Sequence, residues 1–545
     1  FSRKKHDSAF PQHAIDWVLS SSGVAIGDID YVVFYEKPFV KFERILMTSL
    51  QTWPKSWEVF RESMLTWLND KLWIKSLIRE RTGTSKAQIL FADHHMSHAA
   101  SSFFCSPFEE AAILTVDGAG EWTTGAMGIG RGTQITLDTE TRFPHSLGLL
   151  YSAFTAFCGF RVNSGEYKVM GLAPYGEPKY LDDIHKVATI TENGTVWCNM
   201  EYFSYHHSPT TTLGHKFFDV FGQPRDPKLD DREVAQKYRD IAASIQAFCE
   251  QAMIAQANHL HETTGLKYLC MAGGCALNSV ANAKILQQTG FERIYIHPAA
   301  GDDGGAVGAA MWATHQLLGL PRANALEHAF LGQEFSSDEC EAWLKSEGLP
   351  YERAADDGAL LDRAAQSIVD GEVLGWMRGR FEWGPRALGA RSIIADARRA
   401  EMKDIVNAKI KFREAFRPFA PSVLAERASE YFDLPDAADH HPARYMLYVV
   451  PVAEDKREEL PAITHVNGSG RLQTVLKETN ADYHGLIQRF EQATGTPVIL
   501  NTSFNLRGEP IVTTPANAYS TFMRSGMDRL YLGNCIVTKS EQPGS

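Results

Sequence analysis

Short apolar runs alternate along the chain with longer segments in which apolar residues recur three and four positions apart. The first pattern predicts strands and the second predicts helices. The predicted strands are 31–35, 111–117, 123–130, 134–140, 268–271, 293–297, 373–377, 447–452 and 497–500, and the predicted helices are 11–20, 232–264, 304–318 and 358–370. This alternation is typical of an α/β protein built in layers.

Local features refine this picture. The run 31–35 is expected to be a buried strand, and the Trp, Leu and Phe residues of about 40–85 lie at helical spacing, which predicts a helical insertion. Turn-sized links between the strands of 111–140 favour antiparallel neighbours. A change of composition within 319–335 predicts a boundary between two domains, 1–325 and 326–545.

Composition and charge exclude several classes of protein. The chain has 545 residues, 44% hydrophobic and 22% charged, which are globular values. Its net charge of −12 excludes an overall basic footprint for nucleic acid. The 8 Cys are scattered without a C-x-x-C pair, and no apolar run approaches a membrane span, so we expect a cytoplasmic protein. The chain begins Phe1-Ser2 without Met or an evident signal peptide, and we expect a further segment before it.

A dense histidine cluster follows the apolar run 89–91. If this segment is helical, His94 and His98 lie one turn apart on one face, where two imidazoles can share a metal. A helix start with solvated histidines explains the same pattern. Asp117 ends an apolar strand before Gly118 and can face a ligand there, although Asp-Gly is also common in simple turns.

Two glycine-containing turns lie between a predicted strand and a predicted helix. Gly273 and Gly274 can present backbone N–H groups to a phosphate, or can serve only tight packing. Asp302 and Asp303 precede the next glycine pair and can either cap a helix or supply a further metal ligand.

Cations are concentrated in the second half of an otherwise acidic chain. They are interleaved with glycine, proline and aromatic residues, which favours a shaped site for phosphate or carboxylate over a solvated basic face. They are Arg378, Arg380, Arg386, Arg391, Lys411, Arg413 and Arg417. Asn501 and Ser503 offer small polar groups at the end of an apolar strand.

Taken in order, these motifs resemble the NodU/CmcH family of O-carbamoyltransferases over nearly the whole chain. The matching segments are RKKH (3–6), HHMSHAAS (94–101), TVDGAGE (115–121), SLGLLY (146–151), GEYKVMGLAPYG (165–176), GGCALN (273–278), GDDGGAVGAA (301–310), GRFEWGPRALGARSI (379–393), FRPFAPSVL (416–424), GRLQTV (470–475) and NTSFN (501–505).

The resemblance implies a Kae1-like N-terminal domain of the actin/Hsp70/sugar-kinase superfold and a YrdC-like α/β C-terminal domain. It also implies that carbamoyl phosphate and ATP give carbamoyl adenylate, whose carbamoyl group is passed to a hydroxyl of a small metabolite such as an antibiotic or a sugar. A divalent metal, iron by preference, and Mg²⁺ with ATP are the implied ions. An N-terminal strand and a general-base His are implied before residue 3.

The resemblance also assigns roles to residues. Asp303 is preferred to Asp302 because it directly precedes Gly304-Gly305-Ala306. The metal ligands are then His94, His98, Asp117 and Asp303, and the catalytic residues are Lys5, His94 and Asp117. The nucleotide-binding residues are Gly118, Gly165, Lys168, Gly273, Gly274 and Asn278. The residues for carbamoyl phosphate and ATP are Arg386, Lys411, Arg417, Arg471, Asn501 and Ser503.

Two other functions are considered. A threonylcarbamoyl transferase acting on tRNA shares both folds, but the charge of −12 opposes unaided tRNA binding. An ATP-binding regulatory protein of the actin/Hsp70 superfold has no evident use for the two histidines. We therefore expect a small-molecule hydroxyl acceptor, no nucleic acid and no membrane as partners, and the chain could form a homodimer.

Overall fold

The computed structural model describes residues 1–69, 71–230, 233–322, 325–414, 416–417 and 419–543. The chain is a mixed α/β protein that divides into two compact units. The N-terminal unit is Phe10–Leu326, and the C-terminal unit combines Phe1–Ala9 with Glu327–Ser545. The first nine residues therefore pack with the second half of the chain, which the predicted boundary at 325 does not anticipate.

The N-terminal unit is built on a central sheet of order β5-β4-β3-β8-β9. Its strands are β3 (Glu110–Val116), β4 (Thr123–Arg131), β5 (Gln134–Arg142), β8 (Tyr268–Ala272) and β9 (Arg293–Ile296). Strands β3, β4 and β5 are antiparallel neighbours, as their short links predict, whereas β8 and β9 run parallel to β3. Strand β3 is buried from Ala111 to Val116 at the centre of the sheet.

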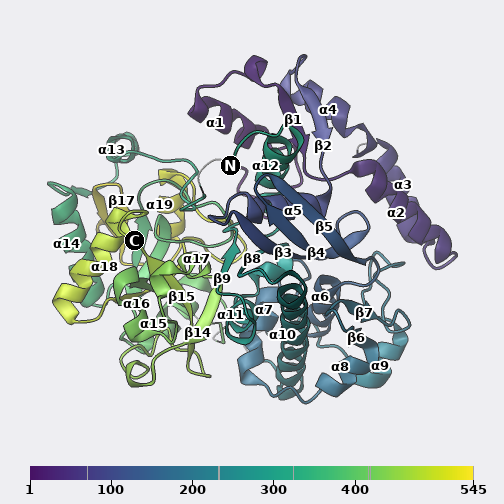
Figure 1. Ribbon diagram of the computed structural model, residues 1–545. Helices are drawn as coiled ribbons and strands as arrows, with labels where there is room; N and C mark the ends of the chain where they lie inside the picture. The colour runs from purple at the N-terminus through teal and green to yellow at the C-terminus, as the bar shows by residue number, and fades with distance from the viewer. Residues whose placement is uncertain (70, 231–232, 323–324, 415, 418, 544–545) are drawn as a thin grey trace. The chain divides into compact units, whose positions relative to one another are not determined.

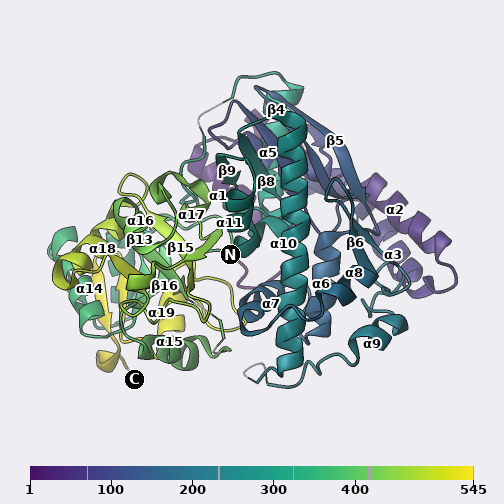
Figure 2. The ribbon, with the colours of Figure 1, turned by 60° about the horizontal axis from the view of Figure 1, so that its bottom comes forward.

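Helices cover both faces of this sheet (Figure 1). On one face lie α5 (His94–Phe103) and α12 (Gly305–Met311), and on the other lies the long helix α10 (Gln236–Thr264), which is prominent in Figure 2. A Cβ on Gly308 would lie 1.8 Å from the Ser97 carbonyl oxygen, so only glycine allows α12 to approach α5 this closely. The predicted helix 304–318 is α-helical only from Gly305 to Met311, and a π-helix, Trp312–Leu317, follows it.

Shorter elements complete this side of the unit. They are α6 (Leu147–Phe157), α7 (Glu166–Leu172), α8 (Leu181–Val187), β6 (Ala188–Ile190), β7 (Val196–Cys198), α9 (His215–Phe221) and α11 (Ser279–Gln288). The first residue of the predicted helix 232–264 lies outside the described residues, and α10 begins at Gln236.

The start of the N-terminal unit is less buried than its hydrophobic pattern predicts. Strands β1 (Tyr31–Phe34) and β2 (Gln88–Phe91) pair in parallel, and β1 is half-exposed instead of buried. Its neighbours are α1 (Gln12–Ser22) and the predicted helical insertion, which forms α2 (Pro38–Gln51), α3 (Trp57–Asn69) and α4 (Ile74–Thr82). Within the described residues, no helix combines the length and apolar character needed to cross a membrane.

The C-terminal unit contains a nine-stranded sheet in the part of the chain that is described. Its order is β10-β18-β17-β11-β12-β16-β13-β15-β14. The strands are β10 (Glu352–Arg353), β11 (Leu374–Met377), β12 (Arg391–Asp396), β13 (Ala420–Leu424), β14 (Tyr448–Pro451), β15 (Ser469–Val475), β16 (Val498–Ser503), β17 (Arg529–Leu532) and β18 (Cys535–Thr538). The helices are α13 (Ser337–Ser346), α14 (Asp357–Val369), α15 (Glu401–Ile405), α16 (Ala428–Tyr431), α17 (His441–Arg444), α18 (Ala481–Thr494) and α19 (Pro515–Met523). Helices α14 and α18 pack together over a core that includes Leu360, Trp376 and Phe490.

Candidate metal centre and anion site

Four side chains converge at one end of the central sheet of the N-terminal unit. His94 and His98 lie on α5, Asp117 directly follows β3, and Asp302 begins the 3₁₀ turn Asp302–Gly304. One ligand atom from each residue lies within 4.8 Å of all the others. Both histidines are buried, and their Nδ1 atoms have no hydrogen-bond partner in the described part of the chain.

The distances direct the imidazole Nε2 atoms at the carboxylates. His94 Nε2 lies 3.2 Å from Asp117 Oδ2 and 3.1 Å from His98 Nε2. Asp302 Oδ1 lies 3.5 Å from both imidazole nitrogens. Two nitrogen and two oxygen donors gathered in this way suit a divalent transition metal.

A buried carboxylate fixes the start of the histidine helix. Glu121 accepts hydrogen bonds from the backbone N–H of His94, at 3.2 Å from each oxygen, and from that of Lys37 at 2.7 Å. The His94 N–H would otherwise be unsatisfied at the start of α5, and Lys37 is the residue directly before α2. Sequence reasoning does not single out Glu121, because an acid 27 residues after the helix start gives no local capping signal.

The carboxylates set the protonation of the cluster. Burial alone would lower the pKa of His98, but hydrogen bonds with Asp117 and Asp302 raise it to about 9. Burial would raise the pKa of Asp117, and its hydrogen bonds with His94 and His98 overcome this and hold that pKa well below its usual range. The cluster therefore favours a histidinium–carboxylate arrangement in which a metal ion would replace protons.

The structure brings Asp302 into this cluster, where the family pattern predicts Asp303. Successive residues of a 3₁₀ turn point in different directions, and here the first one faces the histidines. The Asp302 side chain is 61% exposed on its other side. Asp303 does not join this cluster, and the desolvation of its carboxyl group raises the pKa of that group. The geometry thus differs from the prediction at one of the four ligands.

Asp117 also joins the cluster to the predicted nucleotide turn. Its Oδ1 accepts a hydrogen bond of 2.8 Å from the backbone N–H of Gly274. Gly273 has a φ of 93°, and a Cβ there would lie 2.3 Å from the Val116 carbonyl oxygen, so the turn requires glycine. Gly118 follows Asp117 in the chain, and its carbonyl oxygen accepts a 2.7 Å hydrogen bond from Ser146 Oγ.

The other predicted nucleotide residues lie on neighbouring elements. Asn278 caps α11 and exchanges hydrogen bonds with Gln246 on α10. Gly165 is the N-cap of α7, and Lys168 Nζ lies 5.2 Å from the centre of the Phe160 ring. Their roles in nucleotide binding stay predictions.

A second cluster in the C-terminal unit consists of cations. Lys411 is buried at the end of a π-helix, Val406–Lys411, and its Nζ donates hydrogen bonds to the Ser503 carbonyl, to the Asn505 carbonyl at 3.0 Å and to Asn505 Oδ1 at 2.9 Å. Burial, followed by the positive charges of Arg413, Arg417 and Lys5, lowers the pKa of Lys411 well below its usual range. Lys5, predicted to be catalytic, is thus grouped with this cluster.

Arg471 on β15 is surrounded by like charges. Burial and the neighbouring Arg386, Arg413 and Arg417 lower its pKa well below the usual range for arginine. Its Nε is buried without a hydrogen-bond partner, and no carboxylate pairs with its guanidinium among the residues that the structure describes. Arg417 is paired with the buried Glu414 at 3.5 Å, and the remaining concentration of cations suits the binding of an anion.

A buried glutamate shapes the loop that carries Arg386. Glu382 Oε1 accepts hydrogen bonds from the backbone N–H groups of Leu388, Ala390 and Arg391 at 2.8, 2.6 and 3.1 Å. The same loop receives a 3.1 Å hydrogen bond from Asn501 Nδ2 at the Ala387 carbonyl. Asn501 Oδ1 is buried and has no hydrogen-bond partner among the residues that the structure describes.

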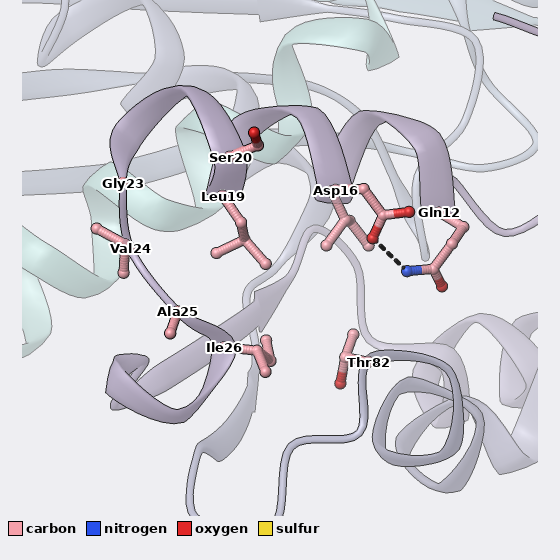
Figure 3. A pocket seen from close by; sticks show the side chains of 10 residues that line it. Gln12, Asp16, Leu19, Ser20, Gly23, Val24, Ala25, Ile26 and Thr82 are labelled. Carbon is pink, nitrogen blue, oxygen red and sulfur yellow. Dashed lines mark hydrogen bonds between the residues drawn. The ribbon is translucent and has the colours of Figure 1, made fainter.

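A separate pocket of about 480 Å³ lies between α1 and Thr82 (Figure 3). Its lining is largely apolar, and its one carboxylate, Asp16, accepts a 2.7 Å hydrogen bond from Gln12. This pocket offers no set of groups for catalysis.

The fold and these clusters define an α/β enzyme with a His/Asp centre in one unit and a cationic anion site in the other. Two family models match the chain, one for the carbamoyltransferase N-terminus over residues 1–311 and one for the carbamoyltransferase C-terminus over residues 365–539. The chain belongs to the carbamoyltransferase family, in agreement with the NodU/CmcH resemblance of its motifs, and is a carbamoyltransferase.

Curated relatives agree over most of their length. An uncharacterized protein of Synechocystis is 46% identical over all of this chain and 92% of the relative. Nodulation protein NolNO of Sinorhizobium fredii is 37% identical over 99% of this chain and 76% of the relative. Nodulation protein NolO of Bradyrhizobium diazoefficiens is 38% identical over 82% of this chain and 79% of the relative.

Proposed function

We propose that this carbamoyltransferase is ATP-dependent and acts on a hydroxyl group of a small metabolite. Water would hydrolyse carbamoyl phosphate to carbamate and phosphate, and a carbamate oxygen would then attack the α-phosphate of ATP and displace pyrophosphate to give carbamoyl adenylate. The acceptor hydroxyl would then attack the carbamoyl carbon, and AMP would leave. In this proposal the C-terminal unit is YrdC-like and forms the adenylate, and the N-terminal unit is Kae1-like and performs the transfer.

The observation that carries the proposal is the concentration of positive charge around Arg471. Arg386, Arg413 and Arg417 surround it, and Lys411 lies in the same cluster. Carbamoyl phosphate and the triphosphate of ATP are both polyanions, and either would be attracted by this concentration of positive charge. Arginine suits this role because its planar guanidinium binds phosphate oxygens in pairs.

Polar groups beside the cations match the remainder of carbamoyl phosphate. The carbamoyl group carries an NH₂ donor, and the buried Asn501 Oδ1 is an acceptor without a partner in the described structure. Asn501 is held in orientation because its Nδ2 donates to the Ala387 carbonyl and to Gln473 Oε1. Ser503 lies at the other end of this strand segment, in contact with Lys411.

The His/Asp centre supports the second half of the proposal. His94, His98, Asp117 and Asp302 would hold one divalent ion, with iron favoured by the family resemblance. When bound, that ion would neutralise charge developing on the phosphate of the departing AMP. Asp117 would orient the ion and, through Gly274 N–H, the turn beside it. The backbone N–H groups of that turn can donate hydrogen bonds to the phosphate of an adenylate.

Pyrophosphate release tests the proposal. The purified protein with ATP, Mg²⁺ and carbamoyl phosphate should release pyrophosphate, and omission of either substrate should abolish the release. A protein that releases pyrophosphate with threonine and bicarbonate instead would be a threonylcarbamoyl-type enzyme. A protein that binds ATP and releases none under either condition would be a nucleotide-binding regulator, and the proposal would be wrong.

A further inference from the structure

Large apolar side chains are exposed on the helical insertion of the N-terminal unit. Helices α2 and α3 lie at the margin of this unit in both Figure 1 and Figure 2. Between residues 39 and 73, the exposed large hydrophobic residues are Phe39 (70%), Met47 (42%), Leu50 (56%), Trp53 (54%), Trp57 (49%), Leu65 (61%), Leu68 (55%) and Trp73 (61%).

On α2 these residues form a stripe along one side of the helix. Phe39, Met47 and Leu50 are spaced eight and three residues apart, which keeps them on one helical face. The side of α2 that contacts α3 is different: the Phe42 and Trp67 rings lie 5.9 Å apart, and Ser56, directly before α3, donates a hydrogen bond from its Oγ to the Ser49 carbonyl.

On α3 a matching stripe has the same spacing. Trp57, Leu65 and Leu68 are again eight and three residues apart. On each helix, the stripe is rotated about a quarter turn away from the side that contacts the other helix. The rotation has the same sense on both when each helix is viewed from its own N-terminus. Because α2 and α3 run antiparallel, this rotation directs both stripes to the same face of the hairpin. We call this face, defined by Phe39, Met47, Leu50, Trp57, Leu65 and Leu68, the hairpin face.

The apolar area of this region is that of an interface. With about 200 Å² for a large side chain, the hairpin face together with Trp53 at its tip exposes on the order of 800 Å². The largest apolar patch of a typical monomer is about 300–600 Å². A stable protein–protein interface buries about 800 Å² on each partner, so the hairpin face together with Trp53 is of the size that such an interface needs.

Its charges point to a second copy of the chain as the partner. Glu43 lies midway between Phe39 and Met47 in the first stripe, and Arg61 lies midway between Trp57 and Leu65 in the second. Both side chains are exposed, and neither forms a hydrogen bond or ion pair with another described residue. One acid and one base at equivalent positions make the face self-complementary, as an isologous interface requires. A face for an anionic membrane would instead be uniformly basic.

We propose that the hairpin face forms a two-fold homodimer, with the apolar stripes of one copy against those of the other and Glu43 of each copy paired with Arg61 of the other. This association is independent of the proposed reaction, because the hairpin face contains none of the residues assigned to the two sites.

Light scattering after size-exclusion chromatography of the full chain tests the proposal. We expect a mass of twice 60.7 kDa for the unmodified protein. The double variant Leu50→Glu/Leu65→Glu should weaken dimerisation at least a hundredfold, and both sites are exposed, so folding should survive. Trp197→Glu, at a 53% exposed residue on β7, is the matched control and should stay dimeric.

A charge exchange tests the pairing itself. Glu43→Arg and Arg61→Glu should each weaken the dimer, and the double variant carrying both changes should restore it. A monomer at every concentration, or a dimer unaffected by Leu50→Glu/Leu65→Glu, would overturn the proposal. So would a monomeric protein that co-sediments with phosphatidylserine vesicles through these residues, which would make the face a membrane contact. Far-ultraviolet circular dichroism confirms that each variant is folded.

Discussion

The choice between Asp302 and Asp303 turns on the direction of one side chain. Both residues precede the same glycines, so sequence alone does not separate them. In the structure Asp302 Oδ1 faces His94 and His98, whereas Asp303 is not part of the gathered set of ligand atoms. The difference follows from the 3₁₀ turn Asp302–Gly304, whose conformation gives no signal in the spacing of motifs.

We expect Asp302→Asn to lower the affinity for a divalent metal at least tenfold, because it removes one of four gathered donors. Asp303→Asn is the matched control and should leave metal content nearly unchanged. Elemental analysis of both proteins after equilibration with limiting Fe²⁺ or Mn²⁺ measures this. If Asp303→Asn loses the metal and Asp302→Asn retains it, the family-based assignment is right and the turn rearranges when metal binds.

As pH rises, the affinity of the cationic cluster for an anion should fall at a lower pH than it would if Lys411 had the pKa of an ordinary lysine. Burial and neighbouring cations lower the pKa of Lys411, and only its charged form attracts an anion. Affinity is therefore greatest below that pKa and falls as pH rises through it, within a window that ends well under 10.5. Sulfate is a suitable probe for calorimetric titrations from pH 7 to 10, because its charge is constant there. Lys411→Arg should flatten the profile, and an unchanged profile in that variant would exclude Lys411 as its source.

At the scale of elements, Glu382 shows how a loop is held in place for binding. Its carboxylate gathers three backbone N–H groups of the loop that carries Arg386. Removing that acceptor leaves buried donors unsatisfied, at a cost of about 1–3 kcal/mol for each group. Glu382 touches no substrate in this account and acts as a positioning residue.

Glu382→Ala should therefore raise KM for carbamoyl phosphate at least tenfold with a smaller change in kcat. Glu382→Gln keeps an acceptor oxygen and should recover most of the loss. Steady-state kinetics with the thermal midpoint of unfolding distinguishes the alternatives. A lower midpoint with an unchanged KM in the alanine variant would show that Glu382 only stabilises the fold.

Sequence predicts the elements of this protein best where hydrophobic periodicity is strong. The antiparallel strands β3, β4 and β5 and the long helix α10 lie close to their predicted bounds. The segment 378–417 is predicted only as cation-rich, and its strand β12 and π-helix 406–411 are missed. Charged residues interrupt the apolar pattern there although they are buried: Arg391 of β12 donates hydrogen bonds to the Gly379 and Gln333 carbonyls, and Asp396 accepts from Arg398. Hydrophobic periodicity does not detect a strand whose charged residues are satisfied by tertiary contacts.

At the scale of the whole molecule, a net charge of −12 coexists with a local concentration of cations. The cations come from segments far apart in the chain, including Lys5, Lys411 and Arg471, and a sum over the sequence hides them. Motif order was sufficient to recognise the carbamoyltransferase family. The packing of residues 1–9 with the C-terminal unit depends on tertiary contacts such as that of Arg3 with Glu509, which no local pattern encodes.

The most direct test of the central claim, that the two units divide the reaction, is a count of labelled carbamoyl adenylate. Protein is incubated with ATP, Mg²⁺ and ¹⁴C-carbamoyl phosphate without an acceptor, and the bound adenylate is measured for the unmodified chain, Arg471→Ala and His98→Ala. The account predicts adenylate at near unmodified levels in His98→Ala and at least a hundredfold less in Arg471→Ala. Equal loss in both variants, or loss in His98→Ala alone, would contradict it.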